Sequence, residues 1–163
     1  MRKKVLIIDD DVAVRESLAA ALSYEDYQTF PAASGEEALK LAAATPVDLV
    51  LLDLTLPGQN GWDIFEALTR EHPLVPVIII TARSNQLFLA LGAGAAALME
   101  KPLDFPELLR TMRGLIDEPA ETRLARLAGR PADFDYRPAG AVSTAGPIGE
   151  YAKSGGSKRE RES

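Results

Sequence analysis

The sequence of 163 residues contains no cysteine and a single histidine, His72. The absence of thiols excludes disulfides, zinc–thiolate centres, iron–sulfur clusters and thiol nucleophiles, and one imidazole cannot form a site that needs two. No apolar run approaches the ~18–20 residues that a membrane-spanning helix needs. The opening MRKKVLII reaches Asp9 after too few apolar residues for the core of a secretion signal. We therefore expect a cytoplasmic protein with no membrane insertion.

Charge and composition divide the chain into two parts. Residues 1–117 carry 17 acidic and 10 basic residues, a net charge of −7, whereas residues 118–163 carry a net charge of +1. An acidic body is poorly suited to gripping nucleic-acid phosphates, so we expect no direct nucleic-acid partner. The second part is rich in Pro, Gly, Ala and Ser and loses its apolar periodicity after Leu127. We predict one domain over residues 1–117 and a largely disordered tail over 118–163, in which the pattern permits a short helix near residues 122–127.

The first part alternates short apolar runs with stretches of helical periodicity. Several of the runs are apolar throughout, which is typical of strands buried on both faces of a sheet. Five strands are expected at residues 5–8, 27–32, 47–52, 75–80 and 96–99, five helices at 12–23, 34–43, 62–70, 86–91 and 104–116, and a loop at 57–61. Such alternation predicts an α/β, doubly wound fold with helices on both faces of a parallel sheet.

Polar side chains stand where these strands end. The first strand runs into Asp9, Asp10 and Asp11, the third into Asp53, the fourth into Thr81 and the fifth into Lys101. Right-handed crossovers bring the carboxyl ends of parallel strands to one edge of the sheet, where ligands bind in such folds. Clustered carboxylates repel one another unless a cation joins them, and ligands that are all oxygen suit Mg²⁺. The pattern therefore predicts a magnesium site at this edge.

Phosphate chemistry fits these residue types. Asp53 could attack phosphorus and form an acyl phosphate. Lys101 could neutralise phosphoryl oxygens, and Thr81 could donate one hydrogen bond to them. Asp11 is expected to cap the helix that starts at residue 12 rather than to bind metal. Each residue type is common by itself, so the joint placement at four strand ends carries the prediction.

Four motifs, in this order, resemble the receiver domain of two-component response regulators. They are VLIIDDD at 5–11, LVLLDLTLPGQNGWDIF at 49–65, PVIIITA at 76–82 and GAAALMEKP at 94–102. The resemblance covers residues 1–117 and points to a single-domain regulator of the chemotaxis-receiver type. It implies a flavodoxin-like fold, a five-stranded parallel sheet with strand order 2-1-3-4-5.

The resemblance also implies a role for each site residue. It makes Asp53 the phosphoacceptor, places Mg²⁺ on Asp9, Asp10, Asp53 and the backbone carbonyl of Thr55, and puts Thr81 and Lys101 against the phosphoryl group. The donor would be a histidine kinase or a histidine phosphotransfer protein. The protein would signal by contacts, slowly hydrolysing its own phosphate, and would not be an enzyme. A downstream protein would bind the face formed by the helices at 86–91 and 104–116 and the strand at 96–99. A homodimer could form on phosphorylation.

Three features depart from the family pattern. Leu98 stands three residues before the lysine, where relatives usually carry Tyr or Phe, so this switch position lacks its aromatic ring. The interval between Thr81 and Gly94 is shorter than usual. Glu100 adjoins Lys101, and its carboxylate is expected to compete for the ammonium group. We therefore predict an intact phosphoacceptor with an unusual readout, in which an exposed part of the apolar run 87–89 marks a partner surface.

Two other functions remain open from the sequence. The run from Asp9 to Asp11, followed by Val12, resembles the opening DxD of the DxDx(T/V) pattern of haloacid-dehalogenase-like phosphohydrolases. Asp9 would then be the nucleophile and Asp11 the acid or base, and Asp53 would be left unexplained. A DNA-binding regulator would need a helix-turn-helix in the tail, where no two apolar-periodic segments flank a short turn.

Overall fold

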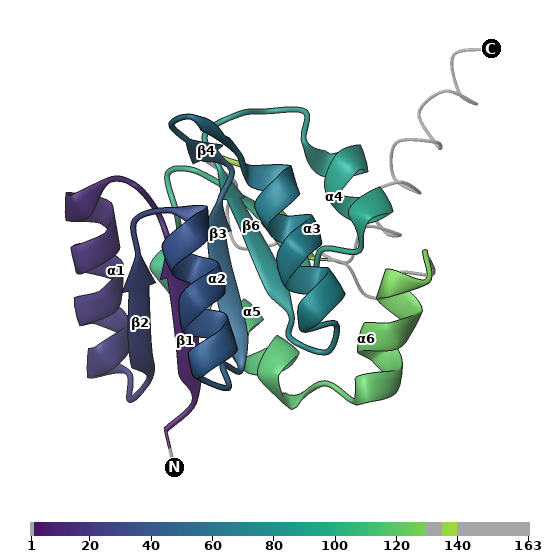
Figure 1. The fold of residues 1–163 in the computed structure, drawn as a ribbon, viewed down its shortest axis with the longest axis horizontal. Coiled ribbons are helices and arrows are strands. Elements are labelled where there is room, and N and C mark those ends of the chain that lie inside the picture. The colour runs from purple at the N-terminus through teal and green to yellow at the C-terminus, as the bar shows by residue number, and fades with distance from the viewer. Residues whose placement is uncertain (1, 130–134, 140–163) are drawn as a thin grey trace, which may run out of the picture.

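The computed structural model describes residues 2–129 and 135–139 and has three layers, a sheet between two sets of helices (Figure 1). The strands are β1 (Lys4–Ile8), β2 (Gln28–Ala32), β3 (Leu49–Asp53), β4 (Thr55–Leu56), β5 (Gln59–Asn60), β6 (Val77–Thr81), β7 (Ala97–Glu100) and β8 (Asp135–Arg137). The helices are α1 (Val12–Tyr24), α2 (Gly35–Ala44), α3 (Gly61–Glu71), α4 (Leu87–Ala93), α5 (Phe105–Asp117) and α6 (Ala120–Leu127). Each strand and helix expected in residues 1–117 is present, with small shifts at the ends.

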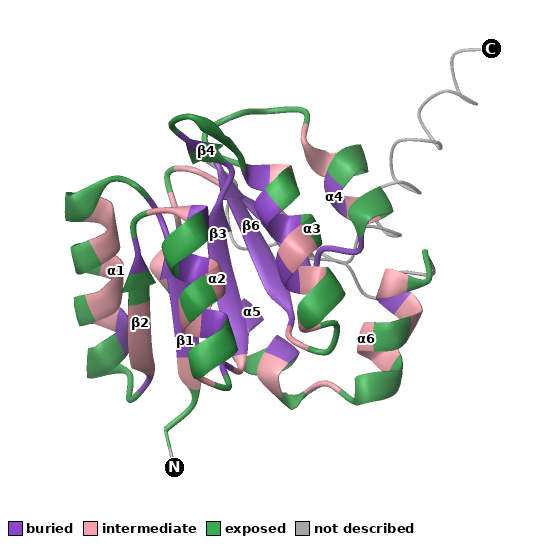
Figure 2. Ribbon diagram, viewed as in Figure 1, coloured by how far each residue is buried: buried purple, intermediate pink, exposed green. Residues whose placement is uncertain are grey.

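The central sheet has the strand order β2-β1-β3-β6-β7-β8, and all of its pairs are parallel. Its first five strands confirm the predicted order 2-1-3-4-5. The middle strands β3 and β6 are buried along their whole length because their apolar side chains point to both faces, which helices cover (Figure 2). The carboxyl ends of these strands therefore meet at one edge of the sheet.

Two apolar cores lie on the two faces of the sheet. Helices α2, α3 and α4 contribute to the core that contains Leu6 and Ile79, and α1 and α5 contribute to the core that contains Ile7 and Ile78. Neighbouring residues of one strand belong to different cores because side chains alternate across a strand. This packing fixes the register of the strands, since a slip by one residue would exchange the two faces.

The segment predicted as a loop at residues 57–61 contains a short hairpin instead. Strands β4 and β5 pair antiparallel across Pro57 and Gly58, and Gly58 takes a φ of +68°, a left-handed conformation that glycine adopts without strain. The side chain of Gln59 accepts a hydrogen bond from the amide of Gly35 at 2.8 Å. The hairpin after β3 is thereby tied to the start of α2.

The predicted cap of α1 by Asp11 is confirmed, and Ser34 caps α2 in the same way. Asp11 accepts hydrogen bonds from the amides of Ala13 and Val14, at 3.0 and 3.3 Å. Ser34 accepts one from the amide of Glu37 at 3.2 Å. These side chains satisfy amides that the first turn of a helix leaves without a partner. The cap also turns the Asp11 carboxylate toward α1.

Two parts of the predicted tail, residues 118–163, form regular elements. Helix α6 agrees with the short helix that the pattern permitted near residues 122–127, whereas β8 was not predicted. Helix α6 is held by Arg126, whose guanidinium makes two hydrogen bonds to Glu118, at 2.7 and 2.9 Å. Arg123 donates to the carbonyls of Leu115 and Ile116 at the end of α5. Strand β8 extends the sheet beyond β7. The other residues of the predicted tail, 130–134 and 140–163, lie outside the described part of the chain.

Within residues 2–129 and 135–139, no helix is long and apolar enough to cross a membrane.

A matched pair of glycine substitutions tests the packing around the start of α3. A Cβ atom on Gly61 would lie 2.6 Å from the Cα atom of Leu54, whereas one on Gly114, inside α5, would meet nothing within 4 Å. We expect Gly61→Ala to lower the free energy of unfolding by about 1–3 kcal/mol because the backbone of Leu54 must move. Gly114→Ala should raise it by about 0.5–1 kcal/mol because alanine favours a helix interior.

Urea denaturation followed by circular dichroism measures both values. A neutral Gly61→Ala would contradict the close approach of α3 to the residue after β3.

Candidate functional site

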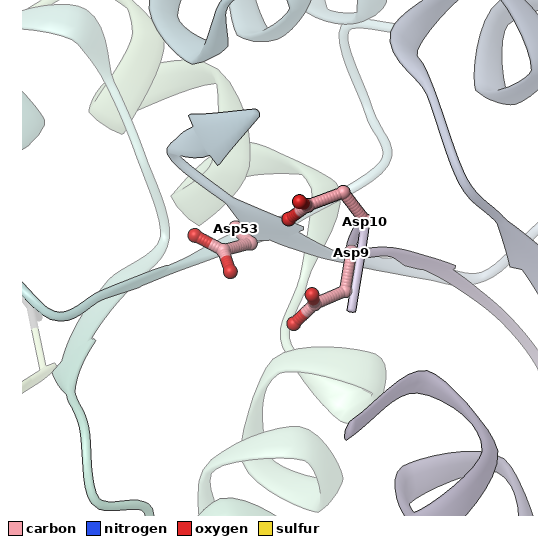
Figure 3. Close-up of side chains that lie close together, drawn as sticks. All are labelled: Asp9, Asp10 and Asp53. Atoms are coloured by element: carbon pink, nitrogen blue, oxygen red, sulfur yellow. The ribbon is translucent and has the colours of Figure 1, made fainter. Parts of the chain in front are cut away.

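Three carboxylates meet at the carboxyl edge of the sheet, as the sequence predicted (Figure 3). Asp9 and Asp10 follow β1, and Asp53 ends β3. One oxygen from each carboxylate lies within 4.8 Å of the other two. Asp9 and Asp53 are buried, while Asp10 is exposed. The cluster is therefore open to solvent on one side and enclosed on the other.

Asp53 is held by contacts to both of its carboxylate oxygens. Its Oδ2 accepts a hydrogen bond from the Lys101 Nζ at 2.7 Å, and its Oδ1 accepts one from the backbone amide of Thr55 at 2.8 Å. The side chain is almost fully buried, so these two contacts set its orientation. A carboxylate oriented in this way can present a lone pair to an incoming electrophile.

Lys101 is the cation of the site. Its Nζ lies 3.5 Å from the Asp9 Oδ2 in addition to its contact with Asp53. Burial acts to lower the pKa of the Lys101 ammonium, but the hydrogen bond and charge of Asp53, with the charge of Asp9, raise it above its usual value. The ammonium group therefore stays protonated while it faces the cluster.

Asp9 is a buried carboxylate whose surroundings disfavour its ionised form. Burial raises the pKa of Asp9 above its usual value, and the nearby charge of Asp53 raises it further, while a hydrogen bond from the Asp11 amide and the charge of Lys101 oppose the shift. The carbonyl of Asp9 accepts a hydrogen bond from Arg15 at 2.7 Å, a contact that the sequence did not indicate. A cation beside Asp9 would offset the cost of its ionised form.

The donor set fits a hard divalent cation. All the side-chain groups that can ligate are carboxylates, and Mg²⁺ prefers oxygen ligands and keeps several of its waters. The exposed Asp10 leaves room for such waters. Thr55 lies two residues after Asp53, in β4, and its amide faces the Asp53 carboxylate.

Thr81 ends β6, the strand between β3 and β7. Its side chain is fully buried. Its hydroxyl oxygen accepts a hydrogen bond from the amide of Arg83 at 2.9 Å, in the segment that leads to α4. The structure therefore brings Thr81 to the edge where the acidic cluster lies. Its hydroxyl is hydrogen-bonded to the segment between β6 and α4.

The segment before α4 is linked to α3 through the only tryptophan of the chain. The Trp62 indole donates a hydrogen bond to the side chain of Gln86 at 3.2 Å, and its ring packs edge-on against Phe65. Local sequence patterns do not indicate this contact, because its two residues are 24 positions apart. The partial exposure predicted for the run 87–89 is confirmed, since Phe88 and Leu89 are exposed.

Leu98 is fully buried, beneath α4 on one face of β7. The expected competition of Glu100 for Lys101 is wrong, because the Glu100 carboxylate accepts hydrogen bonds from the Tyr136 hydroxyl and the Ala139 amide, both at 3.1 Å. These two donors lie in and after β8, a strand that the sequence did not predict.

The geometry also bears on the alternative phosphohydrolase. In that interpretation Asp11 would act as acid or base beside Asp9. The Asp11 carboxylate instead caps α1 and lies outside the three-carboxylate cluster. The lysine–aspartate contact of the site involves Asp53, which that interpretation leaves without a role.

Comparison with known proteins places this geometry in a family. A sequence model described as the response regulator receiver domain matches residues 5–113. Among characterised proteins, the response regulator MprA of Mycolicibacterium vanbaalenii is 37% identical over 118 residues, covering 71% of this chain and 51% of that protein. The DNA-binding response regulator MtrA of Mycobacterium tuberculosis H37Rv is 37% identical over 127 residues, covering 74% and 55%. The chain spans about half the length of these relatives.

Solved structures agree with this match. A CheY-like receiver domain protein from Methanospirillum hungatei superimposes with a TM-score of 0.70 and 30% identity, covering 74% of this chain and 98% of the other. The response regulator TrrA of Thermotoga maritima, solved in complex with Mg²⁺ and BeF, gives 0.65 and 31%, covering 69% and 98%. The order of the first five strands, the three carboxylates and the match over residues 5–113 together show that the chain belongs to the response regulator receiver domain family.

Proposed function

We propose that this receiver domain accepts a phosphoryl group on Asp53 from a phosphohistidine of a histidine kinase or a histidine phosphotransfer protein. The observation that carries the proposal is the 2.7 Å contact between Lys101 and the buried Asp53, beside two more carboxylates. An oriented carboxylate next to a fixed cation suits attack on phosphorus. The protein then acts as a phosphoacceptor that signals, and turnover is limited to slow hydrolysis of its own acyl phosphate.

The transfer is a simple displacement. An Asp53 carboxylate oxygen forms the bond to phosphorus as the bond between phosphorus and the donor imidazole nitrogen breaks, and the imidazole leaves with the electron pair. Negative charge on the phosphoryl oxygens increases near Asp53, where Lys101 supplies a positive charge. The Thr55 amide keeps Asp53 in position from the other side.

Mg²⁺ is the proposed cofactor. Asp9, Asp10 and Asp53 would hold it, with the backbone carbonyl of Thr55 as a further ligand. When bound, the metal would neutralise charge on the carboxylates and on the phosphoryl oxygens. The raised pKa of Asp9 supports this role, because burial and the charge of Asp53 disfavour an ionised Asp9 that has no cation next to it.

Thr81 is the proposed sensor of the phosphate. A phosphoryl group on Asp53 offers new acceptors near Thr81, whose hydroxyl now accepts from the Arg83 amide. Reorientation of this hydroxyl would release Arg83 and shift the segment before α4 in a population shift between two states. The Trp62–Gln86 hydrogen bond lies on the path of that shift.

The output surface is proposed at α4, β7 and α5, and a downstream protein would bind there. No direct nucleic-acid partner is proposed, although the name of MtrA describes a DNA-binding protein. The aligned part of this chain covers 55% of that relative, and the acidic balance of residues 1–117 gives little attraction for phosphate backbones. A cytoplasmic location and a homodimer on phosphorylation remain parts of the proposal.

The first prediction concerns the phosphoacceptor. Incubation with acetyl phosphate and Mg²⁺ should add one phosphate to the wild-type chain, visible as a mass increase in intact-protein mass spectrometry. Asp53→Asn should reduce incorporation to background because the attacking oxygen is gone. Asp11→Asn is the matched control and should keep near-normal incorporation, since an asparagine side chain still caps α1. Loss of the label in Asp11→Asn, with retention in Asp53→Asn, would support the phosphohydrolase instead.

The second prediction concerns Asp9 and the metal. A carboxylate whose pKa is raised in the folded state lowers stability once it ionises, so its cost is absent at acidic pH and develops as pH rises through the folded-state pKa. Without Mg²⁺ at neutral pH, Asp9→Asn should therefore raise the unfolding temperature by a few degrees. Added Mg²⁺ should raise it for the wild type and for the exposed control Asp117→Asn, and hardly at all for Asp9→Asn. A lower unfolding temperature for metal-free Asp9→Asn, or an equal response of all three chains to Mg²⁺, would contradict the assignment.

The third prediction separates phosphorylation from the switch. Trp62 is the only tryptophan, so its fluorescence reports on the segment before α4. Phosphorylation should change this fluorescence in the wild type. Thr81→Ala should keep most of the phosphate incorporation and lose most of the fluorescence change, because the hydroxyl that would couple them is missing, while Thr81→Ser should keep both. An unchanged response in Thr81→Ala would show that Thr81 is not the coupling residue.

A further inference from the structure

Strand β8 covers the outer edge of β7. Residues Ala97, Leu98 and Met99 pair in parallel with Asp135, Tyr136 and Arg137. Without β8, β7 would be the edge strand of the sheet, with unpaired backbone groups available to another chain. The chain therefore fills its own sheet edge with a segment that lies 35 residues beyond β7.

Side chains fix this strand in one register. The Tyr136 hydroxyl and the Ala139 amide both donate to the Glu100 carboxylate, each at 3.1 Å. The Arg137 guanidinium pairs with Glu107 of α5 at 3.2 Å. Glu107 is buried, and an ion pair with a buried carboxylate is screened less than one at the surface. A strand of three residues gains its specificity from these contacts more than from its length.

Tyr136 also contributes to the apolar core. Its ring packs against the core that contains Leu98 and the α4 residue Ala90. An aromatic side chain thus lies beside Leu98 and comes from the tail instead of from β7 itself. Glu100, which binds the tail, directly precedes Lys101, which binds Asp53. One strand end therefore carries both the anchor of the tail and the cation of the site.

We propose that residues 135–139 are an intrachain ligand of the β7 edge, so that a protein that binds this edge must first displace them. The description of this edge as an output surface rests on the proposed function, while the occupancy of the edge does not. The occupant that the edge fits is an extended segment parallel to β7, with an aromatic hydroxyl opposite Glu100 and a cation opposite Glu107. Glu100 supplies the acceptor for the hydroxyl, and Glu107, which also pairs with Arg110, supplies the carboxylate for the cation.

Full-length variants test the occupancy. Tyr136→Phe combined with Arg137→Gln removes the hydroxyl that donates to Glu100 and the guanidinium that pairs with Glu107, and keeps the ring and most of the side-chain volume. Tyr24→Phe combined with Arg2→Gln makes the same chemical changes at exposed positions. The Lys101 amide donates to Thr81 of β6, so alternation along β7 also directs the Met99 amide toward β6 and directs the Leu98 amide toward β8. Hydrogen exchange of the Leu98 amide, followed by NMR, should be about tenfold or more faster in the Tyr136/Arg137 variant and unchanged in the control.

A peptide supplied in trans tests the binding surface. The peptide ADFDYRPAG, residues 132–140, should perturb the Leu98 amide resonance of the Tyr136/Arg137 variant at lower concentration than that of the wild type, because the wild-type edge is filled at a millimolar effective concentration. A peptide with Tyr136 and Arg137 replaced by alanine should have no effect. Equal exchange of the Leu98 amide in all chains would overturn the occupancy, and failure of the millimolar peptide to perturb the Leu98 amide in the variant would overturn the binding surface.

Phosphorylation of the same samples separates this inference from the proposed function. The Tyr136/Arg137 variant should incorporate phosphate from acetyl phosphate as the wild type does, because Asp53 is held by Lys101 and the Thr55 amide, and Lys101 by Asp53 and Asp9. A protected Leu98 amide without phosphate incorporation in any chain would contradict the proposed function and leave the occupied edge intact. Normal phosphate incorporation with an unprotected Leu98 amide would contradict the occupied edge and leave the proposed function intact.

Discussion

The contact between Lys101 and Asp53 is the interaction on which the rest of the site depends. It joins residues 48 positions apart, at the ends of β7 and β3, two strands that β6 separates in the sheet. Its 2.7 Å length requires all three strands to end at one level, and the fully apolar strands provide that alignment by burying both faces. Ionising a buried carboxylate beside two others costs free energy. The Lys101 ammonium group is therefore needed both for the structure of the site and for its chemistry.

The same constraint explains why the site is suited to a transient modification. The cluster holds more negative charge than Lys101 alone can offset, as the raised pKa of Asp9 indicates. A divalent cation would neutralise the remaining negative charge of the cluster, and a phosphoryl group on Asp53 would add negative charge again. Thr81 is buried, and its hydroxyl accepts a hydrogen bond from the segment before α4. A change of charge at Asp53 would therefore reach that segment through Thr81. The proposed signalling role thus follows from charge balance in a confined space.

Much of the fold and site could be predicted from the sequence, because both depend on local patterns. Apolar runs identified β1, β2, β3, β6 and β7, and the rule that parallel strands end at one edge brought Asp9, Asp53 and Lys101 together. Contacts between distant segments could not be predicted in this way. The hairpin of β4 and β5 contains Pro57 and Gly58, which favour a loop.

Strand β8 was missed for the same reason. It has three residues, lies in a segment rich in proline and glycine, and owes its place to Glu100 and Glu107, which are distant in the sequence. The prediction that Glu100 would compete for Lys101 failed because the partners of Glu100 were in that unpredicted strand. A tail contact of this kind gives the receiver fold of this chain a sixth parallel strand at the proposed output face.

Reductive trapping can show directly whether Asp53 carries the phosphate. Borohydride reduces an aspartyl phosphate to homoserine, so treatment of the phosphorylated full chain followed by peptide mass mapping locates the acyl phosphate. Homoserine is expected at position 53 only, and only when Mg²⁺ is present during phosphorylation. Homoserine at position 9, or none at position 53 under conditions that label the chain, would contradict the assignment of the phosphate to Asp53.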